Sequence, residues 1–312
     1  MTITKPRALR RGDVIGICCP ASAPSSEDAL SRGIAYLEGL GYRVELGRNI
    51  HRKRGYLAGT DAQRAADVNE LFANRKVRAI IAARGGYGSH RILPLLNYRL
   101  IKQNPKILLG YSDLTALQLA LMAKTGLVTF SGPMVSSELS SGLRGKAEEW
   151  FWRCLTSTKT LPALHIGTYK QHKPKTGETA SGRLIGGNLS VVSSSVGTPY
   201  FPNLPAPILL LEEIDERPYR IDRMLRQIRL AGILSGAKGI ILGAFVNCKP
   251  ERGKPSLSLR QVFGDTFGEI GCPVIKGLHY GHVRNLLTMP LGIRVGLDTV
   301  SGRIRFLESA VS

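Results

Sequence analysis

The sequence predicts a two-domain protein of the α/β class: a doubly wound parallel sheet at the N-terminal side, then a smaller β-rich domain, either a barrel or a sandwich. Three observations predict it. The chain of 312 residues is long enough for two moderate domains, each with a sizeable core. Its first half alternates short apolar runs with amphipathic segments, which is typical of a parallel sheet covered by helices. Its second half has short apolar runs between glycines and few helical patterns.

Strands of the first domain are expected wherever a short apolar run is bounded by polar or glycine residues. The runs that meet this description are 14–19, 42–46, 77–83 and 107–109. In a doubly wound sheet, ligands bind beyond the carboxyl ends of the strands. The loops that follow these runs are therefore the first places to look for a site.

Helices are expected between these strands, where apolar residues recur at helical spacing. The segments are 27–40, 62–72, 90–96 and 114–123. In the first of them, Leu30, Ile34 and Leu37 approximate one face. Thr60 or Asp61 is the expected N-cap of the second, because both residue types accept hydrogen bonds from the unpaired N–H groups of a first turn.

Residues 157–181 interrupt this alternation. The segment is rich in Lys, Thr, Gly and Pro and lacks a sustained period, which predicts a linker or an exposed excursion. We therefore expect an α/β domain over 1–156 and a β-rich domain over 182–312. The second domain contains one clear helical pattern, which has Pro218 near its start.

The formal net charge of +20 predicts attraction to an anion, whether a nucleic acid, a membrane lipid or an acidic small substrate. A non-enzymatic nucleic-acid-binding protein is one reading of this charge. No RNA-recognition, zinc-finger or helix-turn-helix signature accompanies it, however. We therefore expect no nucleic-acid partner.

Five cysteines are present, an odd number without a C-x-x-C pair, which argues against both a disulfide framework and a zinc site. Near the N-terminus the apolar run 14–20 is too short for a signal peptide or a membrane-spanning helix. The expected location is the cytoplasm, with no membrane partner.

Three loops follow apolar strands of the first domain: "CPASAPSS", "RGGYGSH" and "GYSDLT". The second holds Gly85, Gly86 and Gly88, which allow backbone N–H groups to approach a ligand closely. It is neither a dinucleotide fingerprint nor a phosphate-binding loop, because the spacing of the glycines fits neither pattern. A tight turn between strand and helix explains the same glycines.

In the third loop, Ser112 and Asp113 stand where a helix begins. The commoner use of such residues is as a helix N-cap. The sharper interpretation is that Ser112 is a nucleophile, which needs a base. His279 and His282, on a glycine-rich loop, are candidate bases.

An acid to orient the base is available where the apolar run 208–211 ends in Glu212 and Glu213, although Glu212 could equally be a solvated strand end. The order serine, acid, histidine is that of the α/β-hydrolases, but G-x-S-x-G would need glycine in place of Leu114. A metallohydrolase using the H-x-x-H pair His279 and His282 is a further alternative, without the helix that fixes such ligands in H-E-x-x-H.

Taken together, five separated motifs resemble the LD-carboxypeptidase family of serine peptidases, over residues 12 to 305. They are "IAARGGYGSHRILPLL", "LLGYSDLTALQLAL", "GRLIGGNLSVV", "ILLLEEIDERPYRIDRML" and "GLHYGHVRNLLTMPLGIRV". The resemblance implies a cytoplasmic, commonly homodimeric peptidase that removes the terminal D-alanine from murein tetrapeptide in cell-wall recycling. It implies no metal or cofactor.

The same resemblance implies roles for individual residues. The family's nucleophile, glutamate and histidine fall on Ser112, Glu212 and His282. Its oxyanion hole, made of backbone N–H groups, falls on Gly86 and Asp113.

The sequence also offers a residue that could contact the substrate. Arg84, beside the glycine-rich loop, is the expected contact for a substrate carboxylate. The other branch of the family, the microcin C self-immunity peptidases, cleaves an aminoacyl-nucleotide antibiotic and typically carries a tryptophan on a loop near the domain junction. Here Trp150 and Trp152 belong to a predicted helix and 157–181 has no tryptophan, which favours the murein substrate.

Overall fold

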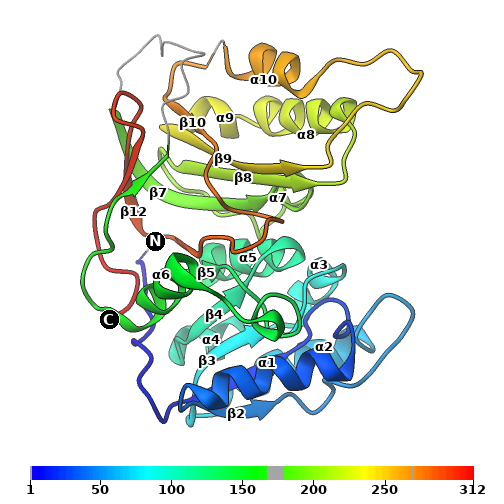
Figure 1. Cartoon of the computed structure of the whole chain (residues 1–312), viewed down its shortest axis with the longest axis vertical. Helices are drawn as coiled ribbons and strands as arrows, with labels where there is room; N and C mark the ends of the chain where they lie inside the picture. Colours follow the sequence, from blue (N-terminus) through cyan, green and yellow to red (C-terminus); the bar gives the residue numbers. More distant parts are fainter. Residues whose placement is uncertain (1, 167–178, 269) are drawn as a thin grey trace.

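The computed structural model describes residues 2–166, 179–268 and 270–312, which form two sheets, each with its own helices (Figure 1). The first sheet has the strand order β11-β5-β4-β3-β1-β2. Its strands are β1 (Val14–Cys18), β2 (Arg43–Leu46), β3 (Val77–Ala82), β4 (Ile107–Gly110), β5 (Thr129–Ser131) and β11 (Met289–Leu291). Strands β1 to β5 are parallel, and β11 pairs with β5 in the antiparallel direction.

Each helix predicted in the first domain has a counterpart in the structure, in the predicted order. The helices of this domain are α1 (Glu27–Gly39), α2 (Asp61–Ala73), α3 (Ser89–Ile92), α4 (Tyr98–Gln103), α5 (Thr115–Thr125) and α6 (Gly145–Thr156), with α4 not anticipated. Thr60, not Asp61, is the N-cap of α2, in a capping box with Gln63. The helix predicted over 90–96 is a turn of α-helix followed by a turn of 3₁₀-helix, Leu93–Leu95.

The second sheet has the order β10-β9-β8-β7-β12-β13-β6. Its strands are β6 (Leu164–His165), β7 (Thr179–Asn188), β8 (Ile208–Ile214), β9 (Gly239–Val246), β10 (Val274–Lys276), β12 (Arg294–Asp298) and β13 (Arg303–Phe306). Strands β7 to β10 are parallel, whereas β7, β12, β13 and β6 pair antiparallel. The predicted fold class is thereby confirmed.

Helices in this second domain are more numerous than the sequence indicated. They are α7 (Leu189–Ser195), α8 (Pro218–Leu230), α9 (Ile233–Gly236) and α10 (Leu259–Phe267), and Figure 1 shows α8 to α10 along the sheet, at the end of the molecule away from the first sheet. Their apolar side chains share a buried cluster with Leu209 and Leu211 of β8. The parallel half of this sheet is therefore an α/β layer.

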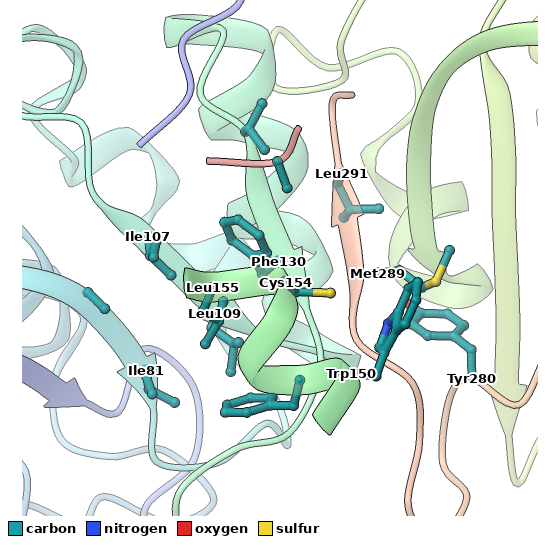
Figure 2. Packing of buried hydrophobic residues seen from close by; sticks show 14 of the residues in the cluster. Ile81, Ile107, Leu109, Phe130, Trp150, Cys154, Leu155, Tyr280, Met289 and Leu291 are labelled. Carbon is teal, nitrogen blue, oxygen red and sulfur yellow. The ribbon is translucent and has the colours of Figure 1, made fainter. Parts of the chain in front are cut away.

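The contact between the two sheets is a continuous apolar core. One buried cluster includes Leu109 of the first sheet and Leu210 of the second. Figure 2 shows Trp150 of α6 in this cluster, beside Met289 of β11 and Tyr280. Trp150 donates a hydrogen bond from Nε1 to the Thr288 carbonyl, at 2.7 Å, immediately before β11. The C-terminal part of the chain is thus fastened to the first sheet through both β11 and α6.

The predicted division at residues 156 and 182 stays a prediction. Within the segment 157–181, residues 167–178 lie outside the described residues. Of the remainder, Leu164–His165 forms β6 at the edge of the second sheet. The five cysteines are buried and free, and among the described helices none is both long and apolar enough to cross a membrane.

Candidate active site

Ser112 lies directly after β4, where the chain turns sharply into α5. Its backbone has φ +63°, a left-handed conformation that is uncommon for a residue with a side chain. Two residues earlier, a Cβ on Gly110 would lie 2.9 Å from Leu114 Cγ, so the turn has no room for a larger residue there. Backbone strain of this kind clusters at functional sites, and here it presents a partly exposed hydroxyl at the carboxyl edge of the sheet.

Three side chains from distant parts of the sequence form one hydrogen-bonded series, which we call the Ser-His-Glu group. His282 Nε2 lies 3.0 Å from Ser112 Oγ, and His282 Nδ1 lies 2.8 Å from Glu212 Oε2. Glu212 ends the apolar part of β8, and His282 lies in the loop between β10 and β11. Such an arrangement can remove a proton from a serine hydroxyl and make it nucleophilic.

The carboxylate of Glu212 is fully buried, so the interpretation of this residue as a solvated strand end is wrong. Asn188 Nδ2 donates to both acids, at 3.2 Å from Glu212 Oε1 and 2.9 Å from Glu213 Oε1. Ser190 N also donates to Glu213, at 2.8 Å. Burial raises the pKa of Glu213 above its usual range, although the hydrogen bonds that it accepts act in the opposite direction.

Asn188 is a functional residue that the sequence interpretation missed. It belongs to the quoted "GRLIGGNLSVV" motif, where its place before a short helix identifies only an N-cap. The structure confirms that cap, because Asn188 Oδ1 accepts from Val191 N. Its contact with Glu212, 24 positions along the chain, has no local signal.

Burial would by itself lower the pKa of His282, but the hydrogen bond to Glu212 and the charges of Glu212, Glu213 and Glu138 together raise it above the usual value. The ring of Tyr111 also contacts the imidazole, with ring centroids 5.0 Å apart. The imidazole is thus held between an aromatic ring and a buried carboxylate. These surroundings therefore stabilise the imidazolium that forms when His282 acts as a general base and accepts a proton.

The glycine-rich loop "RGGYGSH" lies against Ser112. A Cβ on Gly85 would lie 3.1 Å from Ser112 Cβ, and one on Gly86, where φ is +101°, would lie 2.2 Å from Ser22 Oγ. Ser22 Oγ in turn accepts from Tyr87 N and donates to the Tyr56 carbonyl. The loop is therefore pinned close to the serine, and an oxyanion hole formed by Gly86 and Asp113 N–H groups stays a prediction.

The side chain of Asp113 has a different role from the one expected. Neither the 3₁₀ turn Ser112–Leu114 nor α5 has a side-chain cap hydrogen bond, so the alternative interpretation of Ser112 or Asp113 as the N-cap of this helix is wrong. Instead, Asp113 Oδ2 accepts from Ser89 N, at 2.7 Å, at the start of α3. The carboxylate ties the "GYSDLT" loop to the glycine-rich loop, because Ser89 belongs to the latter.

The H-x-x-H pair does not converge on a common point. His279 is exposed, and its Nε2 lies 2.8 Å from the Arg284 carbonyl. Both ring nitrogens of His282 have partners in the Ser-His-Glu group. Within the described ranges, no group of three or more His, Cys, Asp or Glu residues is placed to hold a metal ion.

A pocket of about 490 Å³ opens beside His282. Its lining includes Tyr111, Glu138, Arg284 and Asn285. Arg84, the predicted carboxylate contact, is exposed and is not among the residues that line this pocket. A larger hollow of about 600 Å³, near α9 and Cys272, is lined by no member of the Ser-His-Glu group and is therefore not the site.

Comparison with known proteins identifies the family of the chain. The sequence model of the LD-carboxypeptidase N-terminal domain matches residues 15–132, and that of the C-terminal domain matches residues 181–297. The probable murein peptide carboxypeptidase of Bacillus subtilis is 37% identical over 309 residues, which cover 99% of this chain and 95% of that protein.

Solved structures show the same similarity. The muramoyltetrapeptide carboxypeptidase from Oxalobacter formigenes has a TM-score of 0.83 and 31% identity, and the match covers 93% of this chain and 97% of that chain. The microcin C7 self-immunity protein MccF, in complex with aspartyl sulfamoyl adenosine, has a TM-score of 0.85 and 27% identity, covering 99% of this chain and 100% of that chain. The two family models together span well over half of the sequence. The chain therefore belongs to the LD-carboxypeptidase family of serine peptidases.

Proposed function

We propose that this protein is a serine LD-carboxypeptidase that releases the terminal D-alanine from murein tetrapeptide and leaves the tripeptide, in the cytoplasm, during cell-wall recycling. The observation that carries the proposal is the Ser-His-Glu group, which joins Ser112, His282 and Glu212 by hydrogen bonds of 3.0 and 2.8 Å. Relatives named as murein peptide and tetrapeptide carboxypeptidases support the choice of substrate.

The proposed mechanism assigns one role to each member of the group. Glu212 holds His282 in the tautomer that has its proton on Nδ1, and stabilises the imidazolium that forms. His282 Nε2 removes the proton from Ser112 Oγ, which attacks the scissile carbonyl. His282 then donates that proton to the leaving amine of D-alanine, and a water hydrolyses the acyl-enzyme by the same route in reverse.

The negative charge on the tetrahedral intermediate needs donors that are already in place. The N–H groups of Gly86 and Asp113 are proposed to supply them, at about 3 kcal/mol each. The close approach of the glycine-rich loop to Ser112 supports this assignment, because a Cβ at Gly85 would be in tight contact with Ser112 and one at Gly86 would collide with Ser22.

The substrate carries several carboxylates, which gives the net charge of +20 an acidic partner. Arg84 immediately precedes Gly85 and is exposed, and we propose that it contacts the carboxylate of the terminal D-alanine. A homodimer is proposed as the assembly, on the resemblance to the family alone.

Mass spectrometry of the products tests the proposal directly. The protein is incubated in parallel with murein tetrapeptide and with aspartyl sulfamoyl adenosine, the ligand of the solved MccF relative. Loss of one alanine from the tetrapeptide supports the proposal, whereas cleavage of the nucleoside alone would assign the protein to the microcin-type branch.

Variants of serine identify the nucleophile. Ser112→Ala is expected to lower kcat by about 10⁴-fold or more. Ser194→Ala is the matched control, because among the described residues the Ser194 hydroxyl bonds only to carbonyls within α7. Turnover by Ser112→Ala within tenfold of the parent protein would remove Ser112 from the nucleophile role.

A further inference from the structure

We infer that the pocket beside His282 binds the side chain of the residue that becomes acylated to Ser112, and that it selects a side chain ending in both an ammonium and a carboxylate group. In this assignment Glu138 receives the ammonium group and Arg284 the carboxylate. The inference rests on the proposed function and adds to it a basis for selecting the third residue of the peptide.

The pocket lies next to the reacting atoms. Tyr111, which lines it, immediately precedes Ser112, and His282, which also lines it, lies 3.0 Å from Ser112 Oγ. A group bound there is therefore close to the scissile bond. The leaving D-alanine is a poor occupant, because in the intact substrate it has only a methyl side chain and no ammonium group for Glu138.

Glu138 is held rigidly at the wall of the pocket. Its Oε1 accepts from Tyr111 Oη at 2.8 Å, and its Oε2 accepts from Met134 N at 3.0 Å. Each carboxylate oxygen has a second acceptor site left after these bonds. Glu138 can therefore bind an ammonium group without giving up either anchor, and it needs little reorganisation to do so.

Arg284 supplies the opposite charge. Its backbone is fixed, because its carbonyl lies 2.8 Å from His279 Nε2 and the next residue, Asn285, has φ +55°. A guanidinium group suits a carboxylate, which it can bind through two parallel hydrogen bonds. The exposed side chain of Arg284 can reach a carboxylate in the mouth of the pocket.

A pocket with one negative and one positive group matches a side chain that carries both charges better than a side chain that carries only one of them. A purely acidic side chain would face Glu138, and a purely basic one would face Arg284, so each leaves one unfavourable pair. The ligand of the solved MccF relative, an aspartyl nucleoside, has an acidic aminoacyl group. Of the side chains near the scissile bond of a murein tetrapeptide, that of diaminopimelate carries both charges.

The experiment compares four tetrapeptides that differ only in the third residue: diaminopimelate, lysine with an ammonium group alone, 2-aminopimelate with a carboxylate alone, and norleucine with neither. The value of kcat/KM is measured on each for the parent protein, Glu138→Gln and Arg284→Gln. Glu149→Gln and Arg252→Gln are the matched controls, because both residues are exposed and neither lines the pocket.

For the parent protein, diaminopimelate is expected to be the best substrate. Glu138→Gln should lower kcat/KM about tenfold or more for the diaminopimelate and lysine peptides, relative to norleucine. Arg284→Gln should do the same for the diaminopimelate and 2-aminopimelate peptides. An effect on His282 or on folding would change all four values by one factor, so the ratios isolate binding in the pocket.

Two results would overturn the inference, and they distinguish its failure from a failure of the proposed function. If the parent protein cleaves all four peptides equally, or if each variant changes all four by the same factor, the pocket does not select a zwitterion while the proposed function stands. If the parent protein releases D-alanine from none of them, the proposed function fails and the inference fails with it.

Discussion

Gly281 lies so close to Glu212 that no other residue fits in its place: a Cβ built on Gly281 would be 2.5 Å from Glu212 Oε2. This is the same oxygen that lies 2.8 Å from His282 Nδ1. Gly281 also has φ +105°, a conformation that favours glycine. The residue before the histidine is therefore as constrained as the histidine itself.

Gly281→Ala is expected to displace the Glu212 carboxylate or the His282 loop and to lower kcat by at least about 100-fold, because a misplaced group next to the chemistry costs about that much. Gly277→Ala is the matched control. Gly277 has a similar φ, +90°, but the one described residue that a Cβ there would meet is Ile166, at 3.9 Å. Equal losses in both variants would show that backbone strain, not the contact with Glu212, is responsible.

The pH dependence of the reaction follows from the raised pKa of His282. The neutral imidazole is the base, so kcat/KM should fall as the pH drops through this pKa, and the midpoint should lie above the usual histidine value of about 6.5. The groups that favour the cation are Glu212, Glu213 and Glu138, with the ring of Tyr111 packed against the imidazole.

Because Glu138 stabilises the protonated form, Glu138→Gln should move this midpoint to lower pH. The profile is measured with the norleucine peptide, whose third residue has no charge to interact with the variant site. Glu149→Gln should leave the midpoint unchanged. A midpoint that stays in place in Glu138→Gln would contradict a direct influence of Glu138 on the imidazole.

Trp150→Phe is expected to lower the free energy of unfolding by about 1–3 kcal/mol, because the buried Thr288 carbonyl loses the Nε1–H donor that lies 2.7 Å away. Trp152→Phe is the control. Its Nε1 donates to Tyr36 Oη at 3.0 Å, within the first domain and at a half-buried position. Urea denaturation followed by circular dichroism measures both, and a larger loss for Trp152→Phe would be inconsistent with a special role for the Trp150 contact.

Where the sequence predicted the fold well, the signal was local and repeated. The strand predicted over 14–19 is β1, and those over 77–83 and 107–109 are β3 and β4, because strands buried on both faces read as continuous apolar runs. Strand β5 and helix α4 have only three and six residues, too few to show a period. The addition of β11 to the first sheet is a long-range pairing that no local pattern encodes.

Prediction of the site has the same limit, because contacts between distant parts of the sequence have no local signal. Ser112, Glu212 and His282 were singled out by their residue types and by the family resemblance, and the structure places them within hydrogen-bond distance of one another. Asn188 and Glu138 were missed because their importance comes from partners 24 and 27 positions away. Glu138 belongs to none of the motifs quoted from the sequence, and its importance is recognised only from its contact with Tyr111 in the structure.

The loop that carries His282 has one end in the second sheet, at β10, and the other in the first sheet, at β11. Its imidazole therefore reaches Ser112 only after both sheets have formed and docked. During synthesis, a chain that has emerged only through α6 has the serine and the glycine-rich loop but neither base nor acid. If Ser112 is the nucleophile, the enzyme is inactive during synthesis until nearly the whole sequence has been made.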